Sequence, residues 1–364
     1  MRLLFYISHM HGGGGERVMS ILCNELVSKG YEVYLAFDIS VPSVYYLDKK
    51  INILSLYPDE FNRMPFLFRT LNLCLNIRRI AKVYSPDIII SFMGITLLVI
   101  PAIGGLSIPV IASEHTTYDQ HFKRLKTKLR MFYMNRFASK VTVLTQHDYN
   151  FLGNRIPQKV VMPNPLSLPI YNGSNNRKKT VLAVGRLDDW YIKGFDNLID
   201  VWAKIVRVYP DWILEIAGAG NRDSMAFLRQ KVSSNKIEHS VRFLGFQSDI
   251  AKVMQHSSVF ILSSRNEGFG MVLLEAMSQG CACASFNCKA GPNEILNHNI
   301  DGLLVEDQNL QALENTMLRL LGDDDLRNRL SKAALKGVEQ FSRNVIISKW
   351  EMLFNKLLNT SNLC

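Results

Sequence analysis

The sequence predicts an α/β fold with two doubly wound parallel sheets, one in each half of the chain. Short runs rich in β-branched and aromatic residues alternate with amphipathic stretches, which is typical of parallel strands joined by crossover helices. This alternation stops once, in a polar interval that contains prolines, and then restarts. The chain has 364 residues, of which 48% are apolar, so it is too long for one ordinary core and too apolar for disorder.

The first half of the chain supplies the strands of the first expected sheet. Each strand is followed by a helical or loop segment, and we expect strands at residues 3–8, 32–37, 88–92, 110–113 and 141–145. These elements define a Rossmann-like domain over residues 1–168. Residues 169–179 belong to a stretch of turn formers without apolar periodicity, so we expect the interdomain linker there.

The second half repeats the same pattern, with expected strands at residues 180–185, 212–217, 241–244, 259–263 and 281–286. It predicts a second Rossmann-like domain over residues 180–342. Ligands of doubly wound sheets bind beyond the carboxyl ends of the strands, so two such domains facing each other across a cleft would hold a substrate there. Residues 343–364 are expected to contain a helix that packs back on the first domain, because apolar residues recur there at helical spacing.

Composition and charge narrow the class of protein. The six cysteines lack the regular spacing of a disulfide framework, which favours a reducing cytoplasm, and Cys281 and Cys283 are expected to be buried small residues. The longest apolar stretch, residues 95–112, is interrupted by prolines and glycines and falls short of a membrane span. Residues 1–168 carry 19 basic against 11 acidic residues. This excess of +8 favours phospholipid, a polyphosphate acceptor or nucleic acid as a partner.

A glycine-rich loop follows the first expected strand and reads His11-Gly12-Gly13-Gly14-Gly15-Glu16-Arg17. Glycines let backbone amides approach a phosphate, and the start of the next helix adds partial positive charge. The loop therefore predicts an anion site. A dinucleotide-binding turn is the alternative, supported by Asp38 at the end of the second strand, but the glycine spacing does not match it.

The second half carries the densest group of candidate site residues. Arg186 follows the strand at 180–185, and Lys193 stands near the start of the next helix. Taken alone, two such cations are more simply explained as solvated surface residues. Glu267 lies in the loop after another strand, and Glu275 lies eight residues on, within an apolar helix, where a buried carboxylate needs partners.

With these motifs in their order, the chain resembles the family-4 retaining glycosyltransferases of the GT-B fold. The resemblance runs over most of the chain, through the glycine loop, Ser113-Glu114-His115, Gly185-Arg186 with Lys193-Gly194, Phe243-Leu244-Gly245, the segment from Glu267 to Glu275, Gly291-Pro292-Asn293-Glu294 and Asp301-Gly302-Leu303-Leu304-Val305. It implies that the first domain binds the acceptor and the second the nucleotide sugar. The loop has a fourth glycine where many relatives have alanine, and Asn266 replaces a bulkier residue, which leaves the donor sugar open.

The resemblance also implies roles for individual residues. Glu267, His115, Arg186 and Lys193 correspond to the catalytic groups, with the two cations on the diphosphate. The remaining donor-binding positions are Gly14, Gly15, Gly245, Phe246, Gly268, Phe269, Gly270, Met271, Val272 and Glu275. No metal and no cofactor are expected, because the cations would neutralise the leaving group and no Asp-x-Asp site stands at a strand end. Front-side attack is favoured over double displacement through Glu267.

A basic amphipathic helix is expected over residues 121–139. Its apolar face would hold Phe122, Leu125, Leu129, Phe132 and Phe137, while the basic residues lie elsewhere on the helix. One interpretation is a helix packed in the core with a solvated polar side. The other is contact with anionic lipid headgroups or a lipid-linked pyrophosphate, at the cytoplasmic face of a membrane. No nucleic-acid-reading motif accompanies the charge.

The expected function is therefore transfer of a hexose or N-acetylhexosamine from a nucleotide diphosphate sugar, most simply a UDP-sugar, to a lipid-linked or cell-surface polysaccharide acceptor. One alternative is a nucleotide-sugar epimerase with the same architecture, which would need no acceptor. The other is an inactive subunit that binds a sugar nucleotide. The joint presence of Glu267, Arg186 and Lys193 argues against loss of activity.

Overall fold

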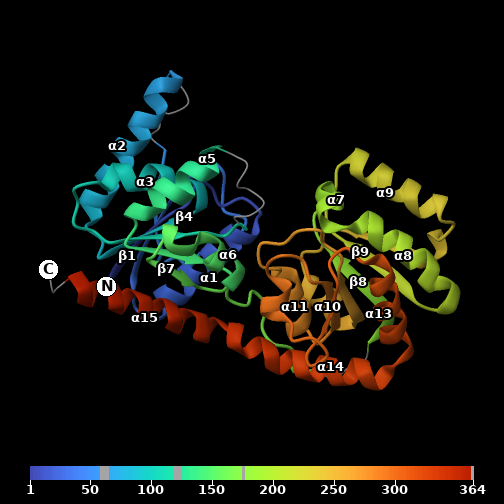
Figure 1. Cartoon of the computed structure of the whole chain (residues 1–364). Helices are drawn as coiled ribbons and strands as arrows, with labels where there is room; N and C mark the ends of the chain where they lie inside the picture. The colour runs from blue at the N-terminus through green and yellow to red at the C-terminus, as the bar shows by residue number, and fades with distance from the viewer. Residues whose placement is uncertain (58–64, 118–124, 174–176, 362–364) are drawn as a thin grey trace. The chain divides into compact units, whose positions relative to one another are not determined.

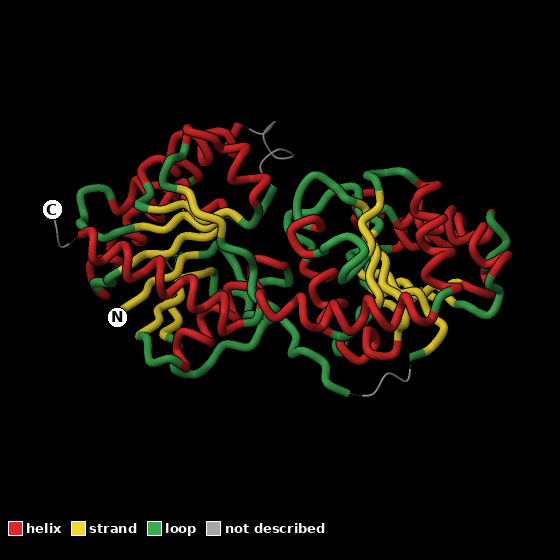
Figure 2. The backbone as a smooth tube through the Cα atoms, turned by 60° about the horizontal axis from the view of Figure 1, so that its bottom comes forward, coloured by secondary structure: helices red, strands yellow, loops and turns green. Residues whose placement is uncertain are grey.

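The computed structural model describes residues 1–57, 65–117, 125–173 and 177–361. It divides into two compact units, one of residues 1–167 with 341–364 and one of residues 168–340. Each unit is an α/β layer structure in which helices lie on both sides of a parallel sheet (Figures 1 and 2). The predicted fold class is thus confirmed, with the strands of the described residues forming one sheet of seven and one of six.

The sheet of the first unit has the strand order β3-β2-β1-β4-β5-β6-β7, with every neighbouring pair parallel. Its strands are β1 (Arg2–Tyr6), β2 (Glu32–Phe37), β3 (Asn52–Ser55), β4 (Ile88–Phe92), β5 (Val110–Ser113), β6 (Lys140–Val143) and β7 (Lys159–Val161). The sequence missed β3 and β7, which are short strands at the two edges of the sheet. Half-exposed strands of three or four residues lack the apolar run on which the prediction depended.

Helices cover both faces of this sheet. Apolar side chains alternate along β1, so that Leu4 and Tyr6 join the core under α2, α3 and α6, while α1 and α15 lie on the opposite side of the sheet (Figure 1). The helices are α1 (Gly14–Ser28), α2 (Phe66–Tyr84), α3 (Thr96–Ile103), α5 (Leu125–Lys128), α6 (Gln146–Leu152) and α15 (Arg343–Ser361). A π-helical turn, η3 (Leu129–Met134), and a 3₁₀ turn, η4 (Asn135–Phe137), continue α5.

The C-terminal helix α15 packs against α1 within the first unit. Most of its predicted apolar positions are buried, whereas Val345 is 39% exposed. Ion pairs tie the two helices together, from Arg343 to Glu25 at 3.3 Å and from Lys29 to Glu351 at 2.6 Å. The first half of α15 is thereby joined to the C-terminal end of α1.

The sheet of the second unit has the order β10-β9-β8-β11-β12-β13, again all parallel. Its strands are β8 (Lys178–Val184), β9 (Ile213–Ala217), β10 (Val241–Gly245), β11 (Ser257–Leu262), β12 (Ala282–Phe286) and β13 (Leu303–Val305). A core built around Trp202 and Trp212 joins one face of the sheet to α8, α9 and α13. The helices are α7 (Trp190–Lys193), α8 (Phe195–Val208), α9 (Arg222–Ser234), α10 (Ile250–His256), α11 (Met271–Ser278), α12 (Pro292–Ile295), α13 (Leu310–Gly322) and α14 (Asp324–Gly337).

One predicted element differs from the structure. The expected helix over residues 121–139 is a short α-helix followed by π-helical and 3₁₀ turns, and residues 121–124 lie outside the described residues. Three predicted members of its apolar face, Leu125, Leu129 and Phe137, are 72%, 41% and 75% exposed. These three side chains are therefore not packed in the core, as one of the two interpretations required.

Candidate active site

In the second unit, the strand order reverses between β8 and β11. From β8 the chain proceeds outward through β9 and β10, whereas β11 leads outward through β12 and β13 on the other side. Such a reversal separates the loops that follow the two central strands and leaves room for a ligand at their carboxyl ends. The loops at this point carry Arg186 after β8 and the segment from Ser263 to Glu267 after β11. These are the positions that the sequence predicted.

Glycines bring the strand ends close together beside this point. The Gly218 amide donates to the carbonyl of Gly245 at 2.8 Å, and the Gly185 amide donates to that of Ala217 at 3.0 Å. A Cβ atom on Gly218 would lie 1.8 Å from the carbonyl oxygen of Gly185, so a larger residue does not fit. The predicted donor-binding residue Phe246, next in the chain after Gly245, is 76% exposed.

Lys193 and Glu267 form the centre of the candidate site. The Lys193 Nζ atom lies 2.8 Å from Glu267 Oε1, and the side chains are only 22% and 9% exposed. The hydroxyl of Ser264 donates to the same carboxylate oxygen at 2.7 Å. Residues 74 positions apart in the sequence thus meet in one shielded ion pair, where charge interactions are stronger than in water.

Arg186, the second predicted cation, lies in a more exposed position. Its side chain is 75% exposed and pairs with Asp189 through Nη2 and Oδ2 at 2.6 Å. An exposed ion pair between residues three positions apart is weak, because water competes for both charges. A phosphate group could therefore replace Asp189 as the partner of Arg186 at little cost.

Helix α11 begins at Met271, directly after Gly270, which has a φ of +95°. Glu275 is 4% exposed in this helix, as the sequence predicted for a carboxylate among apolar neighbours, whereas Met271 and Val272 in the first turn are partly exposed. The side chain of Phe269 is buried, so a contact of this residue with a ligand would come from its backbone.

In the first unit, the strand order reverses between β1 and β4. The glycine loop follows β1, Met93 follows β4 and His115 follows β5. A Cβ atom on Gly15 would lie 3.0 Å from Met93 Cε and 3.9 Å from His115 Cβ, so the three loops meet at one edge of the sheet. Met93 has a φ of +53°, an uncommon conformation for a non-glycine residue, which no sequence motif indicated.

His115 is held by its neighbours in an uncharged state. Its ring stacks on Phe92 with 4.5 Å between centroids, and its Nε2 atom lies 3.0 Å from the hydroxyl of Ser113. Burial lowers the pKa of His115 to about 4, although the neighbouring Asn164 opposes this shift. The ring is therefore neutral at pH 7, and it offers a hydrogen-bonding group rather than a positive charge.

Two buried polar atoms at this edge lack a partner. Thr142 donates to the Ser113 hydroxyl at 2.8 Å, and the same hydroxyl shares a hydrogen bond with His115 Nε2. Within the described residues, His115 Nδ1 and Asn164 Oδ1 have no hydrogen-bond partner. Buried groups of this kind mark a place where a ligand or water binds. Asn164 was missed because its Pro-Asn-Pro context reads as a linker.

The glycine loop itself differs from a simple anion site. Glu16 is 7% exposed, and its carboxylate lies so close to Gly13 that a Cβ there would be 2.2 Å from Oε2. His9 Nδ1 approaches Glu16 Oε1 at 3.2 Å. An acidic group already occupies the start of α1 and offsets its partial positive charge. Among the described residues, nothing lies within 4 Å of a Cβ position on Gly12 or Gly14, so the loop offers space there.

Two aspartates and two cysteines that could suggest a metal site, Asp188, Asp323, Cys281 and Cys283, have structural roles. Asp188 accepts from the amide of Asn221 at 2.7 Å, and Asp323 caps α14 by accepting from the amide of Leu326 at 2.8 Å. In the part of the chain that the structure describes, no group of three or more His, Cys, Asp or Glu side chains could hold a metal ion. Cys281 and Cys283 are buried as predicted, and burial raises the pKa of Cys281 to about 11.

Family models match both units of the chain. The model described as Glycosyltransferase Family 4 matches residues 12–168, and that described as Glycosyl transferases group 1 matches residues 169–337. The amylovoran biosynthesis glycosyltransferase AmsD of Erwinia amylovora is 30% identical over 97% of this chain and 99% of its own. The chain belongs to glycosyltransferase family 4. The resemblance found in the sequence motifs is therefore confirmed.

One further relative and one solved structure are similar to this chain over almost the whole length of both proteins. An α-1,4-N-acetyl-D-galactosaminyltransferase of Campylobacter jejuni, whose name gives an undecaprenol-linked acceptor, is 26% identical over 99% of both chains. The crystal structure of HepE from Anabaena, in complex with UDP and glucose, superimposes with a TM-score of 0.81 at 20% identity and covers 98% of this chain and 100% of its own. The fold of this family 4 glycosyltransferase is thus GT-B.

Proposed function

We propose that the protein is a retaining, metal-independent glycosyltransferase that moves a hexose or N-acetylhexosamine from a UDP-sugar to a lipid-linked or cell-surface polysaccharide acceptor. The shielded Lys193–Glu267 pair at the strand-order reversal of the second unit is the observation that carries this proposal. UDP as the nucleotide is supported by the complex of HepE with UDP and glucose. A lipid-linked acceptor is supported by the undecaprenol compound in the name of the Campylobacter relative.

The reaction breaks a bond between an anomeric carbon and a phosphate oxygen, so negative charge grows on the diphosphate. Lys193 supplies a preorganised cation, and Arg186 supplies a second one after exchanging Asp189 for phosphate. The free amides at the start of α11 add partial positive charge. These groups perform the neutralisation for which other transferases use a metal ion.

Retention is proposed to proceed by front-side attack assisted by the leaving phosphate. Glu267 Oε1 already accepts hydrogen bonds from Lys193 and Ser264, which stabilise its negative charge and make it a poorer nucleophile. Double displacement through Glu267 is the alternative route. Glu275 is assigned to the ribose hydroxyls, and the Nδ1 atom of the neutral His115 to a hydroxyl of the transferred sugar.

The acceptor is proposed to be reached from a membrane surface, on its cytoplasmic side. No helix among the described residues is long and apolar enough to cross a membrane. The first unit, however, exposes large apolar side chains on α5, η3 and η4 and carries most of the net positive charge. Apolar side chains next to basic ones suit the headgroup layer of an anionic bilayer.

A nucleotide screen tests the donor class. We expect UDP, but not GDP or ADP, to raise the melting temperature, because a ligand at about one hundred times its Kd stabilises the folded state by roughly 2.7 kcal/mol. With a UDP-sugar and a polyprenyl-diphosphate glycan, transfer should then continue in the presence of EDTA. Loss of activity with EDTA and recovery with manganese would overturn metal independence. Epimerised sugar nucleotide formed without an acceptor would instead identify the epimerase alternative.

A further inference from the structure

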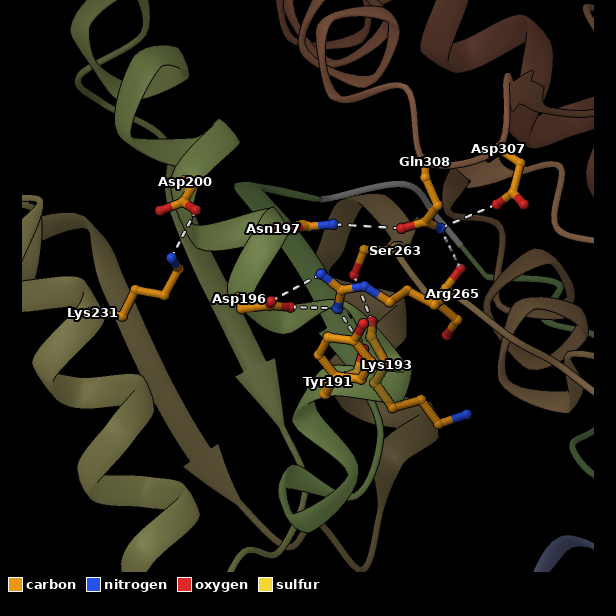
Figure 3. Close-up of polar contacts among 11 residues, drawn as sticks. Tyr191, Lys193, Asp196, Asn197, Asp200, Lys231, Ser263, Arg265, Asp307 and Gln308 are labelled. Atoms are coloured by element: carbon orange, nitrogen blue, oxygen red, sulfur yellow. Dashed lines mark hydrogen bonds and ion pairs between the residues drawn. The ribbon is translucent and has the colours of Figure 1, made fainter.

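Two loops of the second unit are joined next to the Lys193–Glu267 pair, and Arg265 lies at their junction (Figure 3). The Arg265 amide donates to the carbonyl of Ile192 at 2.8 Å, and its guanidinium donates to the carbonyl of Tyr191. These bonds connect the loop after β11 to helix α7, which ends at Lys193. Arg265 thus contacts the two residues that precede Lys193.

The guanidinium of Arg265 is fixed in orientation by a second partner. It forms two bonds with Asp196 in the first turn of α8, at 2.7 Å and 2.9 Å, and the side chains are only 18% and 15% exposed. It also lies 4.1 Å from the centre of the Tyr191 ring (Figure 3). A two-bond arginine–carboxylate pair specifies geometry more narrowly than a single contact does.

The backbone of Lys193 is held from the other side as well. The hydroxyl of Ser263 donates to the Lys193 carbonyl at 2.9 Å. Gly194 has a φ of +65°, and a Cβ there would lie 2.0 Å from the Ser263 carbonyl oxygen. The chain on both sides of Lys193 is therefore pressed against the loop that carries Glu267.

We infer that Arg265 is a positioning residue of the transfer reaction, which places the Lys193 ammonium, the partner of Glu267, for the donor diphosphate. This inference rests on the proposed function. Arg265 acts through the loop backbone, because its own charge is satisfied by Asp196 and the Tyr191 carbonyl. Small displacements of a reacting group cost on the order of 10²-fold in rate, so a junction of this kind controls activity.

The same helix offers a matched control. Asp200, one turn after Asp196 on α8, pairs with Lys231 of α9 at 2.7 Å, with side chains 45% and 24% exposed (Figure 3). This pair also joins two elements of the second unit, but Lys231 has no contact with α7 or the loop after β11 among those described for it. Lys231→Gln therefore removes an ion pair of α8 and leaves the contacts of Arg265 unchanged.

The test compares Arg265→Gln and Lys231→Gln in wild type and in Lys193→Ala, with UDP-sugar as the varied donor. Arg265→Gln should raise the donor KM and lower kcat/KM by roughly 10²-fold in wild type, but by less than about 3-fold in Lys193→Ala, since the residue acts through Lys193. Lys231→Gln should change kcat/KM less than about 2-fold. If Arg265→Gln and Lys193→Ala lower kcat/KM independently and additively, the inference is wrong.

Hydrogen exchange gives a second readout that needs no donor. Arg265→Gln should accelerate amide exchange at residues 190–194 and 263–268 beyond any change in Lys231→Gln, because both loops lose their connection. Unchanged exchange in these segments would overturn the inference even in an active enzyme. If Arg265→Gln does not fold, Asp196→Asn keeps the shape of the pair and removes its charge. If wild type binds no nucleotide but Arg265→Gln still shows faster exchange than Lys231→Gln, the proposed function is wrong and the inferred junction is not.

Discussion

At the scale of single residues, the sequence predicts which side chains belong to the candidate site, but not which side chains they contact. It predicted that Lys193 and Glu267 are site residues, yet it gave no sign that they pair with each other at 2.8 Å. Such a contact depends on how two loops, separated in the chain by α8, β9, α9, β10, α10 and β11, meet at the edge of a sheet. Arg265 was missed for the same reason, because its partners Tyr191 and Asp196 lie 74 and 69 positions away in the sequence.

The neutral state of His115 leads to a prediction about stability. Its pKa is lowered from 6.5 to about 4 by burial, so the unfolded chain binds a proton between these values that the folded protein does not. The contribution of the neutral His115 to the free energy of unfolding is fully present above pH 6.5 and is lost as the pH falls towards 4. Relative to His115→Gln, wild type should lose roughly 3 kcal/mol of unfolding free energy between pH 7 and pH 4.

Urea unfolding of both proteins at several pH values measures this difference. The comparison with His115→Gln removes the contributions of carboxylates, which titrate in both proteins. Parallel stability curves for the two proteins would show that His115 titrates normally in the folded state. The assignment of a neutral imidazole to the sugar hydroxyl would then be wrong as well.

At the scale of elements, strands and helices with strong patterns were predicted within a few residues. The predicted limits of β2, β4 and β5 agree with the structure. The segment over residues 125–137 was not predicted correctly, because helical spacing alone does not distinguish a regular helix from α, π and 3₁₀ turns in succession. The positions of the site residues can be predicted because these residues follow strands. The geometry of the site cannot, because it depends on the turns after those strands.

Gly194 shows how one turn between elements governs the site. Gly194→Ala should destabilise the second unit by more than the 1–2 kcal/mol or so that a left-handed conformation costs an L-residue, because its Cβ would also meet the Ser263 carbonyl. The variant should lose activity beyond its loss of stability, since Lys193 is adjacent. Gly94→Ala is the control, as none of the residues that the structure describes lies within 4 Å of its Cβ position. Equal melting temperatures for the two variants would contradict this account of the turn.

At the scale of the whole molecule, charge and exposed apolar surface fall on the same part of the chain. The net charge is +10, of which residues 1–168 hold +8. In this part, Leu125, Leu129, Tyr133 and Phe137 recur every four residues with exposures between 41% and 75%. Helix α3 packs against this segment and against α2. On α2, the side chains of Phe68, Leu71 and Leu75 are each more than half exposed. The apolar side chains therefore belong to one neighbouring group of helices.

This arrangement predicts reversible binding to anionic membranes through the first unit. The protein should co-sediment with vesicles containing phosphatidylglycerol at low salt, and less with neutral vesicles or at high salt, because ions screen the attraction. Replacing Leu129 and Phe137 with serine should weaken binding by about 10-fold or more, since each side chain buried in the interface contributes roughly 1.5–3 kcal/mol at most. Serine at Val208 and Ile300, which are 59% and 63% exposed in the second unit, should leave binding unchanged. Equal losses from the two pairs of substitutions would mean that no particular face of the molecule meets the bilayer, and equal binding to neutral vesicles would exclude the electrostatic part of the attraction.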